Sequence, residues 1–336
     1  MTVWHPDRKR TVKLLHGTVV MLLLLSLLLL LLPLSITLHA LHGRSLLPAD
    51  AVKAEYCNGI QYWYRPCGHL TSTEDVLLAY YTIFDMGDKS KRKLDDTTMY
   101  IDFGCGVGST LLLVSRYVTA VGVEAQTVSY NLLRRTLEDN KLEDRVKIFN
   151  CDLRDIARGS VCSELFEPNM YDYITANPPF ISPGKGTLPK DEQRKFARFE
   201  LRGNIVDYFK AASSLLKENG TLLVAFPSHE SARLAEAALS TGLKCMRRLD
   251  VRGSGNSNSI YEVQHIDNEK SNKREEVYLL DISRDQTTKR LSKNYVAIQD
   301  ALGMKPRPLR GGIHKGVTAL PLAHPAVVAH PPLPLL

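Results

Sequence analysis

The chain has 336 residues, 44% of them hydrophobic, and its 43 lysines and arginines against 36 acidic residues give a formal net charge of +7. The hydrophobic content excludes a largely disordered protein, and the positive charge favours an acidic partner such as RNA over a basic one. The six cysteines form neither a Cys-x-x-Cys pair nor a His-rich spacing, which argues against a structural zinc site.

An apolar segment lies near the N-terminus. Residues 18–38 contain no charged side chain, and eleven leucines lie between Leu22 and Leu34. A segment of this length can span a bilayer, so we predict a transmembrane or signal-anchor helix at 18–38 and a membrane-anchored protein in an unknown organelle. The basic residues before it would keep the N-terminus cytoplasmic. The alternative is removal of the segment, which would leave a soluble protein in an organelle or the cytosol.

The rest of the chain divides by composition. Periodic strands and helices are confined to about residues 55–300, which is enough for one α/β domain. Around it we expect a basic segment at 1–17, a linker at 39–54 and a Pro-rich, disordered tail at 301–336.

A glycine-rich turn follows the first strand expected in this domain. The apolar run Met99–Phe103 leads into the pattern Asp-x-Gly-x-Gly-x-Gly, and residues of helical character follow. Glycine is needed in such a turn because a Cβ would keep a ligand away from the backbone. A nicotinamide-binding turn would place a third glycine where Ser109 stands, which disfavours a dehydrogenase. The alternative is a tight turn without a ligand. The residues that we expect to bind the ligand are Asp102, Gly104, Gly106 and Gly108.

Two further strand ends carry acidic residues. The run Val118–Val123 ends in Glu124, whose carboxylate can accept hydrogen bonds from both hydroxyls of a ribose. The run Val146–Phe149 leads to Asp152, a candidate for holding the adenine of a cofactor. The alternatives are an ordinary solvated carboxylate at Glu124 and a turn residue at Asp152.

The tetrapeptide Asn177-Pro178-Pro179-Phe180 leaves the end of a fourth expected strand, Tyr171–Ala176. Two prolines remove two backbone donors, so the local carbonyls and the Asn177 amide oxygen can hold an exocyclic amine by its two hydrogens. Phe180 could provide a face on which a planar acceptor stacks. Catalysis at such a site is mostly orientation of the amine. We therefore expect all four residues to be catalytic; the alternative is a Pro-rich turn.

Helices and strands alternate after this motif. Helices are expected at 204–217 and 228–241, and strands at 221–226 and 243–249. The alternation predicts a mainly parallel sheet with helices on both faces and ligands at the carboxyl ends of the strands. Either 260–266 or 276–282 could form the last strand. Of the cysteines, we expect a small loop residue at 105 and buried thiols at 151 and 245, and a bridge between Cys57 and Cys67 stays open.

The glycine turn resembles the signature loop of class I S-adenosylmethionine-dependent methyltransferases. Residues 61–249 further resemble the bacterial family that methylates adenine N6 beside the anticodon of a valine tRNA. Three pieces carry this likeness: Gln61 with Gly68-His69-Leu70-Thr71-Ser72-Thr73-Glu74-Asp75, the tetrapeptide at 177–180, and Ala197-Arg198-Phe199-Glu200.

The resemblance implies a Rossmann-like class I methyltransferase fold with a mainly parallel seven-stranded sheet, and S-adenosyl-L-methionine as cofactor. It also implies that Asp75 and Asn177 contact the cofactor pocket and that Arg198 and Glu200 lie near the acceptor site, although an exposed salt bridge is as compatible with this pair. A phenylalanine replaces the tyrosine that often ends the tetrapeptide, which loses a hydroxyl. The same tetrapeptide occurs in enzymes that methylate DNA adenine, rRNA guanine and a release-factor glutamine.

These patterns together predict an S-adenosylmethionine-dependent methyltransferase acting on an exocyclic amine, most readily adenine N6 in tRNA or another structured RNA. Six basic residues between Lys185 and Arg202 could face phosphates or simply be solvated. The expected partners are RNA and, through residues 18–38, a membrane. The alternatives are a protein-glutamine N5-methyltransferase acting on a release factor and a non-catalytic membrane-tethered binding module.

Overall fold

The computed structural model of the chain describes residues 47–88, 93–160, 166–253, 258–267, 272–285, 287–288 and 290–304, and the backbone of 328–329. All of them belong to one compact unit, Leu47–Leu336. The predicted basic segment 1–17, helix 18–38 and nearly all of the tail 301–336 lie outside the described residues, so the predicted domain bounds remain predictions.

The expected membrane anchoring requires correction. Among the described ranges, no helix is both long enough and apolar enough to cross a bilayer. The segment on which the expectation was based, 18–38, is outside these ranges. The leucine content of that segment is therefore the sole basis of the expectation, and no described helix supports it.

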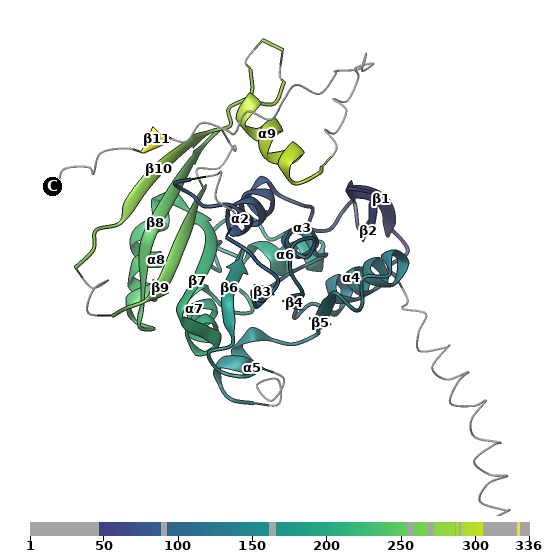
Figure 1. Ribbon diagram of the computed structural model, residues 1–336. Coiled ribbons are helices and arrows are strands. Elements are labelled where there is room, and N and C mark those ends of the chain that lie inside the picture. Colours follow the sequence, from purple (N-terminus) through teal and green to yellow (C-terminus); the bar gives the residue numbers. More distant parts are fainter. Residues whose placement is uncertain are drawn as a thin grey trace, which may run out of the picture. The chain divides into compact units, whose positions relative to one another are not determined.

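The main sheet contains nine strands within the described part of the chain, in the order β11-β10-β8-β9-β7-β6-β3-β4-β5 (Figure 1). Their bounds are β3 Tyr100–Phe103, β4 Ala120–Val123, β5 Val146–Phe149, β6 Tyr171–Ala176, β7 Leu216–Pro227, β8 Leu243–Arg252, β9 Asn258–His265, β10 Glu276–Asp281 and β11 Val328–Ala329. The mainly parallel α/β fold is confirmed, but the sheet exceeds the predicted seven strands. Both candidates for the last strand form: β9 pairs antiparallel between β7 and β8, and β10 pairs parallel to β8 on its outer side.

The parallel strands set the position of the site. β6, β3, β4 and β5 are neighbours, and each pairs parallel with the next. Their carboxyl ends therefore meet at one edge of the sheet, where α/β proteins of this kind bind ligands. The glycine turn, Glu124, Asp152 and Asn177 each follow one of these four strands directly.

Helices cover both faces of the sheet (Figure 1). Their bounds are α2 Thr73–Ile83, α3 Ser109–Val114, α4 Thr127–Asn140, α5 Leu153–Ala157, α6 Glu192–Arg198, α7 Ile205–Leu215, α8 Ser231–Leu239 and α9 Lys293–Ala301. Successive side chains of a strand point to opposite faces, so β7 contributes Leu222 and Val224 to the core under α5, α7 and α8, and Leu223 and Ala225 to the core under α2, α3, α4 and α9.

A two-stranded hairpin precedes the main sheet. It consists of β1 Val52–Cys57 and β2 Ile60–Tyr64, joined by Asn58 and Gly59, which both have positive φ. The Tyr56 hydroxyl donates to the Ser109 carbonyl at 2.6 Å, and the Trp63 ring nitrogen donates to Asp139 at 2.9 Å. The hairpin is therefore attached to α4 and to the first turn of α3, directly behind the glycine turn.

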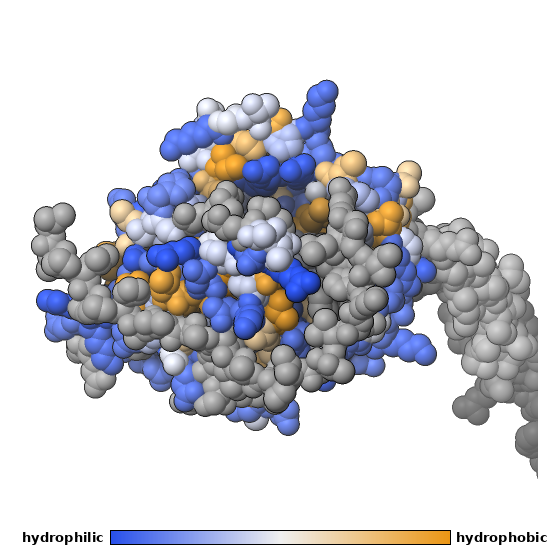
Figure 2. All heavy atoms as spheres, turned by 90° about the horizontal axis from the view of Figure 1, so that it is seen from above, coloured by the Kyte–Doolittle hydropathy of each residue, from blue (hydrophilic) through white to orange (hydrophobic). Residues whose placement is uncertain are grey.

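The described surface is mixed. The face in Figure 2 shows small hydrophobic areas separated by hydrophilic ones. The large hydrophobic side chains that are exposed come from separate parts of the chain: Val52, Leu70, Leu188, Leu201, Leu239 and Ile266. Single exposed residues of this kind are usual on a folded protein and do not by themselves indicate a partner.

Candidate active site

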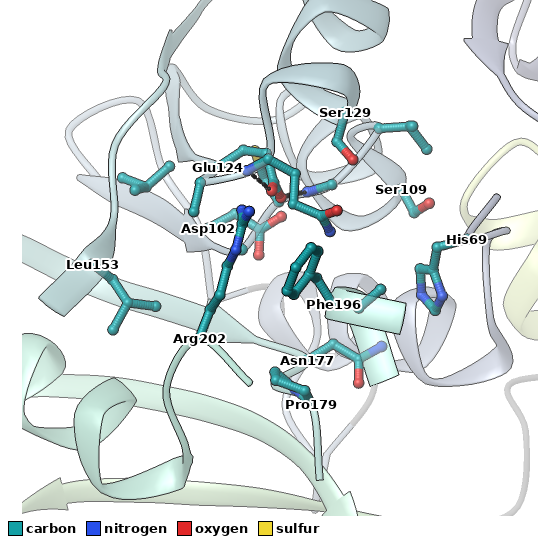
Figure 3. A pocket seen from close by; sticks show the side chains of 18 of the residues that line it. His69, Asp102, Ser109, Glu124, Ser129, Leu153, Asn177, Pro179, Phe196 and Arg202 are labelled. Carbon is teal, nitrogen blue, oxygen red and sulfur yellow. Dashed lines mark hydrogen bonds between the residues drawn. The ribbon is translucent and has the colours of Figure 1, made fainter. Parts of the chain in front are cut away.

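A cavity opens at the carboxyl ends of β3 to β6 (Figure 3). Most of the residues singled out from the sequence line it: Asp75, Asp102, Gly104, Gly106, Glu124, Asp152, Asn177 and Pro179. Gly108, Pro178 and Phe180 are not among the lining residues. The sheet thus brings together residues that lie about a hundred positions apart in the chain.

The three glycines of the turn have different roles. All have positive φ, of +66° at Gly104, +57° at Gly106 and +91° at Gly108, so each favours glycine for its backbone alone. A Cβ on Gly106 would point into open space, with its nearest neighbour 4.0 Å away, whereas one on Gly108 would lie 2.6 Å from a methyl group of Leu133. Gly106 therefore leaves room for a ligand, and Gly108 allows the turn to pack against α4.

Glu124 fixes the shape of the turn. One carboxylate oxygen accepts from the Gly106 N–H at 2.8 Å, and the other accepts from the Gln126 N–H at 2.6 Å. The residue is 6% exposed, and burial raises the pKa of its carboxyl while these two backbone N–H groups oppose the shift. Each oxygen keeps a second lone pair that could accept from a ribose hydroxyl, as the sequence predicts.

Asp102 is a buried carboxyl group beneath the cavity. It is 4% exposed and accepts a hydrogen bond from the Thr175 hydroxyl at 2.6 Å. Burial raises its pKa to about 8, and the nearby negative charges of Asp75 and Glu124 add to the effect. A positively charged ligand group would reverse this balance because it favours the ionised form.

Asp152 begins α5. Its carboxylate caps the helix by accepting from the Arg154 N–H at 2.9 Å, and it also forms an ion pair with the Arg154 guanidinium at 2.6 Å. Burial raises the pKa of Asp152, but the hydrogen bonds from Arg154 outweigh it and hold the pKa below its usual value. Asp152 is therefore a negatively charged wall of the cavity, and its contact with adenine stays a prediction.

Asn177 is held by the start of α2. Its side-chain nitrogen donates to an oxygen of Asp75 at 2.8 Å and to the Ser72 hydroxyl at 3.3 Å. The sequence assigned Asp75 to the cofactor pocket; its carboxylate does line the cavity, but its closest partners are Asn177 and the Ser72 N–H. The amide orientation of Asn177 is therefore set by a neighbouring carboxylate.

Phe180 does not line the cavity. Its ring packs in a T-shaped arrangement against Phe226, with centroids 6.4 Å apart, and forms part of the core on the α7 and α8 face. Phe196 of α6 (Figure 3) and Tyr208 of α7 are aromatic residues that line the cavity instead. The sequence could not distinguish these rings, because any aromatic residue suits stacking and only packing decides which way each points.

Arg198 and Glu200 do not form the exposed pair that the sequence left open. Glu200 instead forms a bidentate ion pair with Arg233 of α8, with N–O distances of 2.6 and 3.1 Å. The Arg198 carbonyl accepts from the Ile181 N–H at 3.1 Å, and the Glu200 N–H donates to the Ile181 carbonyl at 2.9 Å. These bonds fix the segment that follows the tetrapeptide.

The helix α6 covers one side of the cavity and was not singled out from the sequence. Gln193 is 2% exposed and donates to the Ser129 hydroxyl at 2.9 Å, which joins α6 to α4. Arg65 forms ion pairs with Asp191 at 2.8 Å and with Asp50 at 2.7 Å, which tie α6 to the hairpin side. The local sequence offers no signal for these two contacts, because Ser129 and Arg65 lie more than 60 positions from α6.

Arg202 and His69 also line the cavity, a position that the sequence did not predict for either. The guanidinium of Arg202 lies 3.9 Å from the centre of the Phe196 ring and points toward Asp102 and Glu124 (Figure 3). The sequence interpreted Arg202 as part of a phosphate-facing or solvated run. His69 also lines the cavity, where burial lowers the pKa of its imidazole, Asp75 opposes this shift, and Arg198 and Arg194 add to it.

The cysteines differ from expectation at one position. Cys57, Cys67, Cys105 and Cys245 are free thiols, and of these Cys105 lies in the glycine turn and Cys245 is buried, as predicted. Cys151, expected as a buried thiol, is disulfide-bonded. Sequence spacing alone offered no reason to pair it.

Comparison with known proteins adds to this geometry. Residues 90–246 match the family model of the methyltransferase small domain. The chain is 28% identical over 157 residues to the tRNA1(Val) (adenine(37)-N6)-methyltransferase of Trichodesmium erythraeum, which covers 45% of this chain and 62% of that protein. It is 25% identical over 209 residues to the enzyme of the same name from Flavobacterium psychrophilum, covering 61% and 83%. A solved structure, a predicted O-methyltransferase of Agrobacterium tumefaciens, aligns with a TM-score of 0.49 and 15% identity over 70% of this chain and 99% of that one.

The mainly parallel sheet and the glycine turn agree with the fold of class I methyltransferases, and residues 90–246 match the methyltransferase small domain. The chain is similar to bacterial proteins named for methylation of adenine 37 in tRNA1(Val). Its aligned part spans 62% of the Trichodesmium relative, so the acceptor of this chain does not follow from the likeness alone.

Replacement of Glu124 by glutamine tests the donor half of the cavity. A glutamine can accept with only one atom, so one of the two backbone N–H groups, of Gly106 or Gln126, would face an amide NH₂. We expect the Kd of S-adenosylmethionine to rise by about 10- to 100-fold, the range expected for a lost charge-assisted hydrogen bond. Titration calorimetry measures this change. Glu143→Gln, at an exposed position after α4, serves as the control and should bind like the wild type; an unchanged Kd for Glu124→Gln would remove Glu124 from the donor site.

Proposed function

We propose that this chain transfers a methyl group from S-adenosylmethionine to an exocyclic amine, namely adenine N6 in tRNA. The observation that carries the proposal is the orientation of Asn177. Its amide nitrogen donates to Asp75 and Ser72, so its carbonyl oxygen is the group left to accept a hydrogen bond from a substrate. An oxygen acceptor suits an amine, which offers two N–H groups, and does not suit a carbonyl.

The cavity fits the proposed donor. The missing Cβ of Gly106 leaves space beside the backbone, which a bulky cofactor needs. Asp102, Glu124 and Asp152 place carboxyl groups around this space, and these complement the positive charges of S-adenosylmethionine. We propose Asp102, Gly104, Gly106, Glu124 and Asp152 as the residues that hold it, with Gly108 supporting the turn from behind.

The bound donor would supply a methyl group on a positively charged sulfur. Asn177 Oδ1, together with the carbonyls beside Pro178 and Pro179, would accept both hydrogens of the amine and so direct the nitrogen lone pair. The nitrogen would form the new N–C bond as the S–C bond breaks, and the electron pair of that bond would stay on sulfur. One amine proton then passes to water. In this step the chain contributes orientation and needs no general base on the nitrogen.

Adenine in tRNA is favoured over other amines by three observations. The similar bacterial proteins are named for that acceptor. Phe196 offers an aromatic face beside the cavity, on which a planar base could stack after leaving its helix. The basic residues between Lys185 and Arg202 follow the tetrapeptide directly and could contact phosphates.

The experiment that tests this proposal compares acceptor classes. The purified chain is incubated with methyl-labelled S-adenosylmethionine and, in parallel reactions, total tRNA or a mixture of release-factor proteins. We expect label in tRNA and none in protein. Label in a glutamine of a release factor would replace RNA with protein as the acceptor, and label in neither would leave the donor site without this activity.

A further inference from the structure

The Asp75 carboxylate accepts hydrogen bonds from two separate segments, the start of α2 and the tetrapeptide that follows β6. One oxygen accepts from the Ser72 N–H at 2.8 Å, and the other accepts from the Asn177 side chain, also at 2.8 Å. The residue is 7% exposed, so neither bond competes freely with water. A carboxylate has one oxygen for each partner, and both are used.

The carboxylate itself is fixed in place. Asp75 is the third residue of α2, and the Ser72 hydroxyl accepts from the Asp75 N–H at 3.2 Å, which completes a capping box. The Asp75 carbonyl accepts from the Thr110 hydroxyl at 3.2 Å, which ties this turn to α3. Every residue of α2 from Asp75 to Ile83 is buried. The support for Asn177 is therefore a rigid helix rather than a mobile loop.

The chemistry of the two groups fixes the amide orientation. A carboxylate only accepts hydrogen bonds, so it attracts the Asn177 NH₂ group and repels the Asn177 oxygen. Rotation of the amide by 180° would place that oxygen against the negative charge of Asp75. In addition, a charged acceptor polarises the amide, which makes Oδ1 a better acceptor for the substrate.

We propose that Asp75 is a positioning residue that keeps the Asn177 carbonyl oxygen turned toward the acceptor amine. This inference rests on the proposed function of Asn177 and assigns Asp75 a role in catalysis rather than in donor binding. The segment Thr-Ser-Thr-Glu-Asp lies beside the tetrapeptide at the start of α2. Its last residue, Asp75, binds the Asn177 nitrogen and so leaves the Asn177 oxygen to accept from N–H donors. Loss of the carboxylate should lower kcat without changing the affinity for the donor.

The test uses Asp75→Asn with Asp207→Asn as a matched control. An asparagine at 75 must present its own NH₂ either to Ser72 N–H or to the Asn177 NH₂, so the amide of Asn177 loses its fixed orientation. Asp207 closes an equivalent capping box at the start of α7, where its carboxylate accepts from the Asn204 N–H at 3.0 Å. Both variants lose a capping box, but only the first frees Asn177. We expect kcat to fall by about 10- to 100-fold for Asp75→Asn, as for a misplaced catalytic group, and less than about threefold for Asp207→Asn. The Kd of S-adenosylmethionine should stay within about threefold of the wild-type value in both.

A second readout does not depend on activity. The side-chain amide signals of Asn177 in a nitrogen-15 spectrum, assigned by their loss in Asn177→Asp, should shift in Asp75→Asn and remain in place in Asp207→Asn. If Asp75→Asn does not fold, Asp75→Glu keeps the charge but moves the carboxylate by one methylene, and the same fall in kcat and the same shift are expected.

The outcomes separate the two proposals. Equal kcat values for the two aspartate variants, or unshifted Asn177 signals in Asp75→Asn, would overturn the role of Asp75. A shifted signal in a protein whose wild type methylates no amine would instead overturn the proposed function and leave the contact between Asp75 and Asn177 intact. A raised Kd for the donor in Asp75→Asn would return the residue to the cofactor pocket.

Discussion

Replacement of Asn177 by alanine should reduce the kcat of methyl transfer by about 10³-fold, a loss similar to that seen when a hydrogen-bonding asparagine is removed from another enzyme's reaction centre. The donor site should stay intact, because the carboxyl groups and the glycine turn that surround it come mainly from β3, β4 and β5, whereas Asn177 follows β6. Single-turnover kinetics measures the transfer step, and titration calorimetry measures the Kd of S-adenosylmethionine, which should change by less than about threefold.

The matched control for this variant is Asn140→Ala. Asn140 is also a partly buried asparagine with a bound amide: its nitrogen donates to the Gln61 carbonyl at 2.6 Å, and its oxygen accepts from the Gln61 N–H at 2.9 Å. It lies at the end of α4 and does not line the cavity. Transfer by Asn140→Ala should therefore match the wild type. If Asn177→Ala also transfers at the wild-type rate, or loses donor binding together with transfer, its assigned role is wrong.

Replacement of Asp102 by asparagine should remove most of the pH dependence of donor binding. The pKa of Asp102 is raised to about 8, first by burial and then by the charges of Asp75 and Glu124. At pH 7 the ligand-free carboxyl is therefore mostly protonated, and binding of a cation beside it requires loss of that proton. The affinity for S-adenosylmethionine should rise by up to about 10-fold per pH unit between pH 6 and pH 8 and level off above pH 8. Calorimetry in buffers of different ionisation enthalpy should detect about one released proton at pH 7.

The asparagine variant should bind the donor about 100-fold more weakly at pH 8 and show no such slope, because an amide has no proton to lose and no charge to offer. Asp172→Asn is the control. Asp172 lies on β6, which pairs with the strand β3 that carries Asp102, but its carboxylate pairs with Lys217 outside the cavity. If the Kd of S-adenosylmethionine depends on pH as strongly in Asp102→Asn as in the wild type, Asp102 is not the titrating group.

The raised pKa of Asp102 should also make the folded protein less stable as the pH rises, whereas donor binding becomes tighter. A carboxyl whose folded pKa exceeds its unfolded value of about 3.9 stabilises the fold fully below pH 4, and this contribution is lost as the pH rises toward 8. The free energy of unfolding contributed by Asp102 should fall by up to about 1.4 kcal/mol per pH unit in that window. Urea denaturation measures the free energy of unfolding at pH 5 and at pH 8. The difference between these two free energies should be smaller for Asp102→Asn than for the wild type. An equal difference would mean that the folded pKa is not raised.

Much of the sheet could be predicted from the sequence. The bounds of β5 and β6 agree with the expected runs at 146–149 and 171–176, because short apolar runs with clear turn residues around them are the strongest strand signal. The strands at the edge of the sheet could not be predicted as well, because either of two runs could have formed the last strand. Long-range pairing decides that both form: β9 lies between β7 and β8, and β10 pairs with the outer side of β8.

The end of the expected helix at 204–217 illustrates a different limit, because Asn219 and Gly220, which follow it, are residues typical of a helix stop. These residues lie within β7, which runs from Leu216 to Pro227 without a break. A Cβ on Gly220 would lie 2.9 Å from the Tyr171 carbonyl, so the glycine permits close approach to β6 rather than ending a helix. A glycine after a helical pattern can end the helix or can allow two strands to approach closely, and the sequence does not distinguish these two roles.

The site was predictable in its backbone and less so in its side chains. Motifs at strand ends placed Asp102, Glu124, Asp152 and Asn177 around one cavity, because parallel strands align their carboxyl ends. Which side chains then face inward depends on packing between distant segments. Phe180 turned into the core and Phe196 into the cavity, and neither direction follows from local sequence.

Nucleoside analysis of enzymatically methylated tRNA tests most directly whether the acceptor is the exocyclic amine of adenine. Total tRNA is labelled by the wild-type chain from S-adenosylmethionine, digested to nucleosides and separated by chromatography with mass detection. We predict that the label elutes with N6-methyladenosine and is absent when Asn177→Ala replaces the wild type. Label on a ring nitrogen, a carbon or a ribose oxygen would contradict this acceptor. The Asn177 oxygen, which is left free because the Asn177 nitrogen donates to Asp75, would then have no amine to orient.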